Sequence, residues 1–423
     1  MKKRYRILLS ILLIISLLSM SSCYLSDLGL DFTGISGDKD GDSSPTGDTY
    51  INVEGGDNLN ITINSNAENN ILSASKALLS SVSVYSVFKT NVTSFGRPTG
   101  ETKEYGSAGS GVIYKLDKNA GDAYIITNHH VVYDVNANTK NHISDDITVY
   151  LYGQQLADYA IKATYVGGSM TYDLAVLKVD ASPILMASSA IAADFADSNE
   201  VSVLDTAIAI GNPEGDGISA TVGYVNVESE YIVMLGADNK TQVEYRVMRV
   251  DTAVNSGNSG GGLFNSEGKL IGIVNAKVVV SDVDSIGYAI PSNVARGVCE
   301  SIIYYCDGTD SEYAYKCLLG ITVSAVSSRA NYDTQTGKVH IVEDVAITEF
   351  TQSSLVKGKL EKNDIIKSIT IDGVEHKVSR IYNVVDAMLN ARVGSEVVIS
   401  VLRGGEEIDV VIPIVDKMLT EYK

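Results

Sequence analysis

A serine flanked by glycines is the residue of this sequence that is best suited to nucleophilic chemistry. It lies in the run Gly257-Asn258-Ser259-Gly260-Gly261. Glycines allow a backbone turn to aim several N–H groups and one hydroxyl at a single substrate atom. A serine hydroxyl is a weak nucleophile at its own pKa, so it needs a base and a group that orients the base. The sequence must therefore supply both partners elsewhere.

His130 is the candidate base, and Asp173 is the candidate carboxylate. The adjacent His129 and His130 follow an apolar run at residues 123–126 in a protein with only 5 histidines. Asp173 stands directly before the apolar run 174–179, where a lone Asp is most often a turn residue. The assignment of Asp173 rests on chain order. His, then Asp, then Ser is the order of the chymotrypsin-like arrangement, with His and Asp in one barrel and Ser in the next.

A competing motif overlaps the same serine. The residues Gly257-x-Ser259-x-Gly261 also satisfy the G-x-S-x-G pattern of α/β-hydrolases, which requires a helix after the serine and a later acid and histidine. Residues 263–273 instead form a turn between two strand-like runs, and the only later histidines are His340 and His376. The sequence therefore disfavours an α/β-hydrolase.

Short strand-like runs surround the three candidate residues. Each is rich in β-branched residues or alternates apolar and polar side chains, over residues 82–88, 111–114, 123–127, 147–152, 174–179, 206–210, 220–227, 243–250 and 270–275. Such an array predicts an all-β barrel or sandwich domain. A helix is expected over residues 291–305, with Ser292 as its N-cap.

Four motifs together resemble the HtrA/Deg family of trypsin-like serine proteases, namely residues 127–131, 173–179, 251–263 and 286–292. The resemblance covers residues 71–415. It implies a mainly β protein, with a chymotrypsin-like double β-barrel protease domain followed by an αβ PDZ domain. The family pattern has the base immediately before a valine, which selects His130 over His129. It further implies degradation of misfolded or damaged exported proteins, and assembly as a homo-trimer or higher oligomer through residues 71–88.

The catalytic roles follow from the mechanism of this class. His130 accepts the proton of Ser259 as the hydroxyl attacks a peptide carbonyl, and Asp173 holds the imidazole. The oxyanion hole is expected in Gly257, Asn258 and Ser259, with the backbone N–H groups of Gly257 and Ser259 as donors. This chemistry needs no metal and no organic cofactor.

The residues before Ser259 bear on substrate choice. Trypsin-like preference for basic residues depends on a carboxylate six residues before the nucleophile, and Ala253 stands there. Four residues are expected to line a small apolar S1 pocket: Val254, Ile273, Val274 and Asn275. We expect cleavage after Val, Ala, Ile or similar residues. Two polar segments, residues 231–241 and 277–285, are expected to be loops that gate the site.

Residues 318–415 resemble one PDZ domain. Its carboxylate-binding loop matches Leu318, Leu319, Gly320 and Ile321, and residues 382–391 suit the helix beside the peptide groove. The resemblance implies binding of peptide C-termini as an added strand. Asn363 stands where glycine is usual, and residues 327–340 are longer and more polar than the family pattern. The alternative is an αβ domain that only packs against the protease.

The N-terminus is typical of a lipoprotein signal. Lys2, Lys3, Arg4 and Arg6 precede an apolar run at residues 7–18 and then small residues up to Cys23. Residues 1–22 are expected to be removed, and a lipid on Cys23 would hold the protein at a bacterial membrane surface, outside the cytoplasm. The alternative is an ordinary cleaved signal with an incidental cysteine. Residues 23–70 are rich in Asp, Gly, Ser and Asn, as in a flexible linker.

Composition excludes some functions and leaves others open. The formal net charge of −19 argues against a nucleic-acid partner. The remaining cysteines, Cys299, Cys306 and Cys317, are odd in number and predict no disulfide framework, although the last two could pair. We expect a protease domain at 71–305, a linker at 306–317, the PDZ domain at 318–415 and a tail at 416–423. The alternative function is a peptide-binding chaperone or stress sensor whose protease site is idle until activated.

Overall fold

The structure is a computed structural model that describes residues 74–94, 97–154, 156–276, 286–309, 311 and 313–422. All of them belong to one compact unit, Asn66–Lys423. The expected signal, Cys23 and the linker to residue 70 lie outside the described residues. No helix among the described residues is long and apolar enough to cross a membrane.

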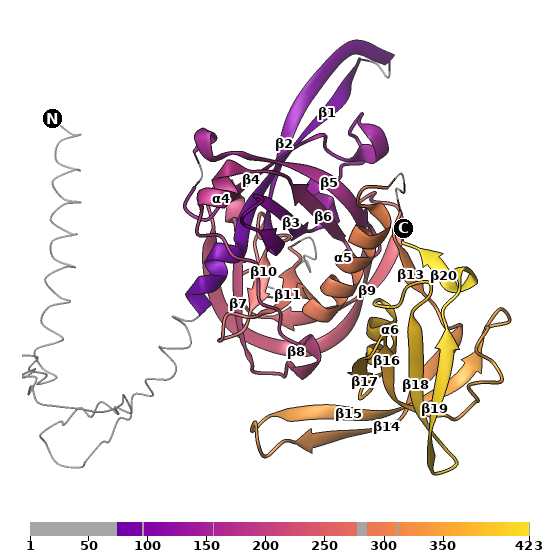
Figure 1. Ribbon diagram of the computed structural model, residues 1–423. Coiled ribbons are helices and arrows are strands. Elements are labelled where there is room, and N and C mark those ends of the chain that lie inside the picture. The colour runs from indigo at the N-terminus through magenta and orange to yellow at the C-terminus, as the bar shows by residue number, and fades with distance from the viewer. Residues whose placement is uncertain are drawn as a thin grey trace, which may run out of the picture. The chain divides into compact units, whose positions relative to one another are not determined.

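Six antiparallel strands form a first closed barrel, which carries the two histidines (Figure 1). Around the barrel the order is β1-β2-β3-β6-β5-β4. Its strands are β1 (Ser81–Ser94), β2 (Arg97–Asp117), β3 (Asp122–Thr127), β4 (Asp146–Leu151), β5 (Ile161–Ser169) and β6 (Leu174–Val179). Short helices join them: η1 (Ser75–Ser80), α3 (His129–Val132), η2 (Lys140–His142), η3 (Ala157–Tyr159) and α4 (Pro183–Ala187).

A second closed barrel carries the serine, in the order β10-β11-β12-β9-β8-β7. Its strands are β7 (Thr206–Gly211), β8 (Ser219–Leu235), β9 (Gln242–Val250), β10 (Gly262–Phe264), β11 (Leu270–Val274) and β12 (Gly287–Pro291). The helical pieces are η4 (Ser198–Glu200), η5 (Pro213–Gly215) and α5 (Ser292–Cys306). The prediction of a mainly β, double-barrel fold is confirmed.

The side chains of β6 pack into two different cores, one on each face of the strand. Successive side chains of a strand point to opposite faces. Leu174 and Val176 contribute to a core shared by both barrels and α5, whereas Ala175, Leu177 and Val179 fill the interior of the first barrel. Both faces of β6 are therefore apolar and buried, and the strand fixes the turn that precedes it, where Asp173 lies.

The C-terminal residues form a separate core around a twisted sheet. Its strand order is β14-β15-β16-β18-β19, with β17 paired to β16. The strands are β14 (Ile321–Tyr332), β15 (Val339–Phe350), β16 (Ile365–Ile371), β17 (Val374–Lys377), β18 (Glu396–Arg403) and β19 (Glu406–Pro413), and the helix is α6 (Ile381–Met388). Asn363, where glycine was expected, takes a φ of 71°, a left-handed conformation that Asn tolerates better than most residues.

The connecting segments differ from the expectations in two places. The expected linker and tail pair with each other, as β13 (Tyr315–Cys317) and β20 (Leu419–Glu421), after a short η6 (Asp416–Met418). Pro291, not Ser292, is the N-cap of α5, because the Ser292 hydroxyl donates to the Ala196 carbonyl at 2.8 Å. The polar segment 327–340 is a β14–β15 hairpin, and its Lys338 contacts Asp205 of the second barrel at 2.6 Å.

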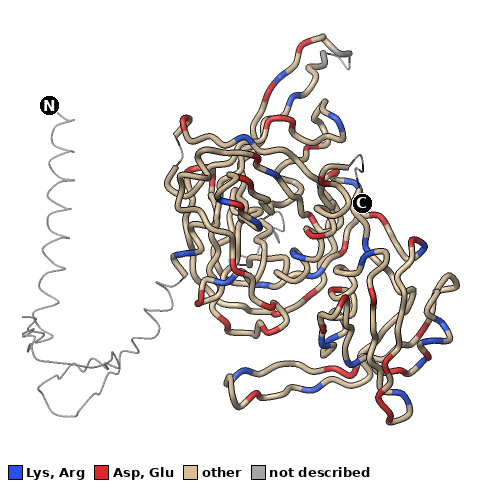
Figure 2. The backbone as a smooth tube through the Cα atoms, viewed as in Figure 1, with Lys and Arg blue, Asp and Glu red and all other residues tan. Residues whose placement is uncertain are grey.

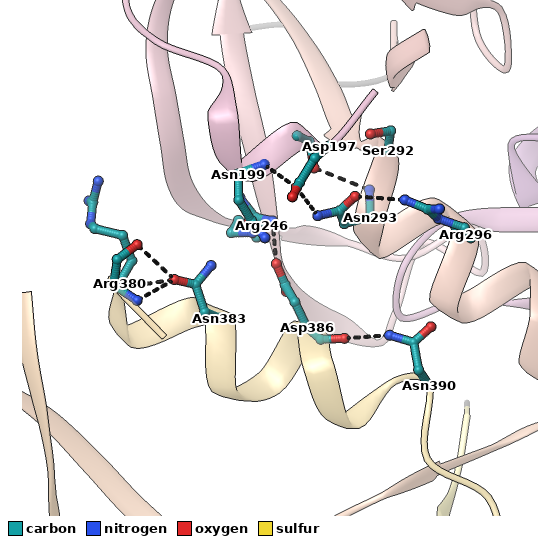
Figure 3. A network of polar contacts seen from close by, with 12 residues as sticks. Asp197, Asn199, Arg246, Ser292, Asn293, Arg296, Arg380, Asn383, Asp386 and Asn390 are labelled. Atoms are coloured by element: carbon teal, nitrogen blue, oxygen red, sulfur yellow. Dashed lines mark hydrogen bonds and ion pairs between the residues drawn. The ribbon is translucent and has the colours of Figure 1, made fainter. Parts of the chain in front are cut away.

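Acidic and basic residues are interspersed along the barrels and the C-terminal sheet (Figure 2). Some of them meet where α6 packs against the second barrel (Figure 3). Arg246 of β9 bonds Asp386 of α6, and both side chains are nearly inaccessible, at 2% and 7% exposed. The Arg246 guanidinium also lies over the Tyr382 ring, 4.1 Å from its centre. Buried charges are costly unless they are paired, so this contact fixes α6 against β9.

Candidate active site

Asp173 is the most heavily bonded carboxylate of the candidate site. It precedes β6 in a turn, has a φ of 50°, and is 5% exposed. Its Oδ1 accepts the backbone N–H of His130 at 3.0 Å, and its carbonyl accepts the side-chain amide of Asn128 at 2.8 Å. Burial by itself raises the pKa of Asp173, but the charge and hydrogen bonds of His130 outweigh this and lower the pKa below its usual value. Asp173 is therefore a fixed carboxylate.

The ring of His130 faces Asp173, and the ring of His129 does not. Nδ1 of His130 donates to Oδ2 of Asp173 at 2.6 Å. The His129 ring stacks on Tyr133, with 5.1 Å between ring centres, and it is 6% exposed. Residues 129–132 form the one-turn helix α3, which directs neighbouring side chains to different sides. The structure therefore brings His130, rather than His129, to the carboxylate.

Asn275 lies beneath Asp173, where sequence reasoning did not expect it. Its side-chain amide donates to Oδ2 of Asp173 at 3.0 Å and to the hydroxyl of Tyr245 at 2.9 Å. Asn275 has no solvent exposure and comes directly after β11, while Tyr245 is in β9. Two strands of the second barrel thus support the carboxylate of the first.

Ser259 lies in the turn before β10 and is 5% exposed. Its carbonyl accepts the N–H of Ser110 at 2.8 Å, which joins the serine turn to β2 of the first barrel. Its hydroxyl oxygen accepts the N–H of Ala276 at 3.2 Å. Among the described residues no hydrogen bond joins this hydroxyl to His130. Catalytic hydrogen bonds are often loose in the unliganded state, so this geometry is compatible with a resting site.

The peptide between Ser256 and Gly257 has a fixed orientation because its carbonyl is hydrogen-bonded. The Ser256 carbonyl accepts the N–H of Glu214 at 2.9 Å. In a trans peptide the carbonyl and the following N–H point in opposite directions. The Gly257 N–H therefore points away from η5. Gly257 has a φ of 96°, a value that other residues rarely adopt.

The N–H groups of Asn258 and Ser259 differ in whether they are free to bind an oxyanion. The Asn258 carbonyl accepts the N–H of Gly261 at 2.9 Å, so the Ser259 N–H points the other way. The N–H of Asn258 itself donates to the Asn255 carbonyl at 3.0 Å. Asn258 is therefore unavailable as an oxyanion donor, and the expected set of three reduces to Gly257 and Ser259.

The residues expected to line the S1 pocket are not gathered in one place. Ile273 and Val274 are buried in the cores of the barrels, and Asn275 faces Asp173. Because the side chains of Ile273 and Val274 fill the core, they are not available to line a pocket. Val254 is partly buried and lies against Gly287 of β12, where an added Cβ would come within 2.6 Å of its Cγ2.

The other predicted regions have mixed outcomes. Residues 231–235 of the first expected gating loop belong to β8, where Tyr231 pairs with Arg246 and Leu235 with Gln242, so only the hairpin turn after Leu235 is a loop. Residues 277–285 lie outside the described residues. In the expected carboxylate loop, the Leu319 carbonyl accepts the Ser354 hydroxyl at 3.1 Å.

Gly320 gives that loop its shape. It has a φ of 68°, and its carbonyl accepts the N–H of Thr351 at 2.9 Å. With the carbonyls of Leu319 and Gly320 both bonded toward residues 351–354, the N–H groups that share their peptides point the opposite way. Leu318 is 46% exposed, and its N–H donates to the Met418 carbonyl at 2.8 Å.

Two barrels with histidine and aspartate on the first and serine on the second define the class of trypsin-like peptidases. The family described as "Trypsin-like peptidase domain" matches residues 109–273, which include all three residues. Serine protease Do-like HtrA of Lactococcus lactis subsp. cremoris is 34% identical over 252 residues, covering 55% of this chain and 56% of that protein. Serine protease Do-like HtrA of Bacillus subtilis is 31% identical over 330 residues, covering 75% and 66%.

The trypsin-like domain of this chain is that of the HtrA family, and the predicted resemblance is confirmed at that level. The chain spans 56% and 66% of the length of these two relatives. Among solved structures, the HtrA-type protease AlgW with tripeptide has 25% sequence identity and a TM-score of 0.47, covering 84% of this chain and 96% of that one.

Proposed function

We propose that this protein is an HtrA-like serine endopeptidase that degrades misfolded or damaged exported proteins. The observation that carries the proposal is the pair formed by half-buried His130 and buried Asp173, with 2.6 Å between Nδ1 and Oδ2, on the barrel next to the Ser259 turn. The homology to serine proteases of the HtrA family supports the same activity.

The proposed reaction is acyl transfer through Ser259. Its Oγ attacks the scissile carbonyl carbon while Nε2 of His130 takes the hydroxyl proton. The C–N bond then breaks, and the same proton goes to the leaving amine. Water repeats the sequence on the acyl-enzyme. Asp173 stays ionised and stabilises the imidazolium, and the N–H groups of Gly257 and Ser259 stabilise the oxyanion.

Substrate choice is proposed to favour small apolar residues at P1. Ala253 offers no carboxylate for a basic side chain, and Val254 narrows the space beside Gly287. A peptide library should therefore show cleavage after Val, Ala or Ile. A profile dominated by Arg or Lys would contradict this proposal.

Casein digestion by the purified full chain tests the proposed activity. Ser259→Ala should abolish digestion, because the variant lacks the proposed nucleophilic hydroxyl. The matched control is Ser266→Ala, a serine in the β10–β11 turn that should leave activity unchanged. Equal digestion by the wild type and Ser259→Ala would end the serine-protease proposal.

The C-terminal sheet is proposed to be a PDZ domain, residues 318–415, that binds peptide C-termini. Strand β14 is at the edge of its sheet, so an extended peptide can add to it. The loop before β14 holds its carbonyls away from this edge, and Val385 of α6 is 44% exposed beside it. Peptides ending in an apolar residue with a free carboxylate should bind, and the same peptides as C-terminal amides should not.

An idle resting form is the second candidate, and the bond from the Ala276 N–H to Ser259 Oγ favours it. Attack requires the hydroxyl also to donate its hydrogen to Nε2 of His130, a bond that is not present among the described residues. A fluorophosphonate probe should then label Ser259 slowly, and a PDZ-binding peptide should accelerate labelling. Unchanged labelling with peptide would contradict ligand control of the site.

Export and assembly complete the proposal on sequence grounds alone. Residues 1–22 would act as a lipoprotein signal, Cys23 would carry the lipid, and residues 71–88 would support a trimer or higher oligomer. Palmitate labelling that persists in Cys23→Ala would contradict the lipid anchor. Light scattering of the protein without its lipid would report the oligomer.

A further inference from the structure

Ser110 joins the two barrels directly behind the serine turn. It lies in β2, between Gly109 and Gly111, and it is 1% exposed. A Cβ on Gly109 would come within 2.7 Å of the Val131 side chain, and one on Gly111 within 2.8 Å of Ile125. The two glycines therefore allow β2 to pass close to its neighbours, and they bring the Ser110 hydroxyl to the turn of the second barrel.

The Ser110 hydroxyl has a defined direction. Its oxygen accepts the backbone N–H of Asn212 at 2.7 Å, and its hydrogen is donated to the Gly257 carbonyl at 2.7 Å. A hydroxyl has one hydrogen to donate, so the Asn212 contact leaves that hydrogen for Gly257. The Ser110 backbone adds a second bond to the same turn, from its N–H to the Ser259 carbonyl at 2.8 Å.

These bonds control the orientation of the oxyanion donors. The Gly257 carbonyl belongs to the peptide between the two N–H groups that are proposed to bind the oxyanion, those of Gly257 and Ser259. Holding this carbonyl restricts rotation about the Cα–C bond of Gly257, which links the peptide that carries the Gly257 N–H to the rest of the turn. Together with the bond from the Ser110 N–H to the Ser259 carbonyl, this bond holds the turn on both sides of the Ser259 N–H, so the backbone that carries both donors is restrained.

We propose that Ser110 is a positioning residue whose hydroxyl aligns the oxyanion N–H groups of Gly257 and Ser259 for the transition state. This inference rests on the proposed protease function and extends it to a residue 147 positions away in sequence from Gly257. In this proposal the Ser110 hydroxyl acts on the turn through its bond to the Gly257 carbonyl, in an orientation set by the Asn212 N–H.

Steady-state kinetics of Ser110→Ala test the inference. The variant leaves the buried Gly257 carbonyl without its donor, so kcat should fall about tenfold to a hundredfold while KM stays within about twofold. A peptide aldehyde ending in valinal, whose adduct with Ser259 has an oxygen in the oxyanion hole, should lose affinity in parallel with kcat/KM. The pH profile should keep its shape, because the His130–Asp173 pair is untouched.

Two controls separate hydrogen bonding from packing. Ser110→Cys keeps the size but donates weakly, so it should be impaired like Ser110→Ala. Ser86→Ala removes another hydroxyl buried in the first barrel, one that has no hydrogen-bond partner among the described residues, and it should behave as wild type. Wild-type kcat in Ser110→Ala or in Ser110→Cys would overturn the inference, as would a loss explained entirely by a smaller folded fraction.

Hydrogen–deuterium exchange over residues 255–262 gives a readout that does not depend on proteolysis. Exchange should be faster in Ser110→Ala than in the wild type or Ser86→Ala, and equal rates would overturn the inference. If the wild type digests no casein, the proposed function fails, and the exchange result still decides whether Ser110 fixes the turn.

Discussion

Asn275 and Asp173 share a hydrogen bond of 3.0 Å to Oδ2, the same carboxylate oxygen that bonds the His130 ring. Asp173 is on the first barrel and Asn275 follows β11 of the second, so the bond crosses between barrels. A carboxylate oxygen held by an amide cannot rotate away from the imidazole. Asn275 therefore orients the carboxylate that bonds His130, and its side chain does not face a substrate pocket.

Asn275→Ala should lower kcat about tenfold to a hundredfold, because a hydrogen bond to a charged group is lost. Its acid limb of kcat/KM against pH should also move to higher pH, since one bond that stabilises the Asp173 carboxylate is gone. Tyr245→Phe removes one acceptor of the Asn275 amide and a weak bond to the Met234 sulfur, and it leaves the bond to Asp173, so its loss should be smaller, about twofold to tenfold. A pH profile identical to wild type in Asn275→Ala would contradict this support.

The ionised form of Asp173 should stabilise the fold in a pH-dependent way. Its pKa is lower in the folded than in the unfolded chain, so the contribution is present above the unfolded pKa and is lost as pH falls through the folded pKa. Denaturant unfolding from neutral pH to about pH 3 should therefore show a steeper loss in the wild type than in Asp173→Asn. Parallel curves would contradict it. At neutral pH the variant should lose about 10⁴ in kcat.

Gly257→Ala should inactivate the protein without unfolding it. The new Cβ would lie 2.2 Å from the Asn212 carbonyl oxygen at a φ of 96°, so the turn must rearrange. Loss of a single oxyanion donor costs about 10² to 10³ in rate. Gly106→Ala is the control, because the nearest atom to its added Cβ is 3.9 Å away. A Gly257→Ala variant with more than a tenth of wild-type kcat would argue against the assigned donors.

Removing one partner of the buried Arg246–Asp386 pair should destabilise the fold, whereas replacing both partners with apolar residues should change the free energy of unfolding much less (Figure 3). Asp386→Ala leaves Arg246 charged and unpaired, so the free energy of unfolding should fall by about 3–5 kcal/mol. The double variant Arg246→Met with Asp386→Leu should recover most of that loss. Lys269→Ala breaks an exposed pair with Glu267 and should leave the unfolding midpoint unchanged. Equal losses in the single and double variants would contradict the argument.

The three described cysteines should react as buried thiols and not as a disulfide. Cys299, Cys306 and Cys317 are free, and burial raises the pKa of Cys306 and Cys317 to about 11. A thiol reagent at neutral pH should modify them slowly in the native protein and completely after unfolding. Recovery of only one of the three thiols after unfolding without reductant would show that the other two are paired.

The three candidate residues could be selected from the sequence because each lies in a short contiguous motif, and the order of the motifs points to a trypsin-like site. The role of Asn275 could not, since a one-residue change in register decides whether a strand residue faces a pocket or the core. Ser110 gave no local signal, because its partner is 147 positions away. The all-β character followed from strand spacing and the double barrel from the family resemblance, but the pairing of residues 315–317 with 419–421 depends on contacts that form only when the C-terminal domain folds.

Because β13 pairs with β20, the segments that precede and follow the C-terminal sheet lie side by side, and the C-terminal domain is held at both of its ends. Beside it Tyr422 packs edge-on against Tyr172, with 5.5 Å between ring centres, and Tyr172 directly precedes Asp173. A truncation at residue 306, meant to isolate the peptidase, would also remove this ring from the turn that carries Asp173. Activity lost in such a truncation would report a damaged active site, and point variants in β14 or α6 are the cleaner probes of communication between the domains.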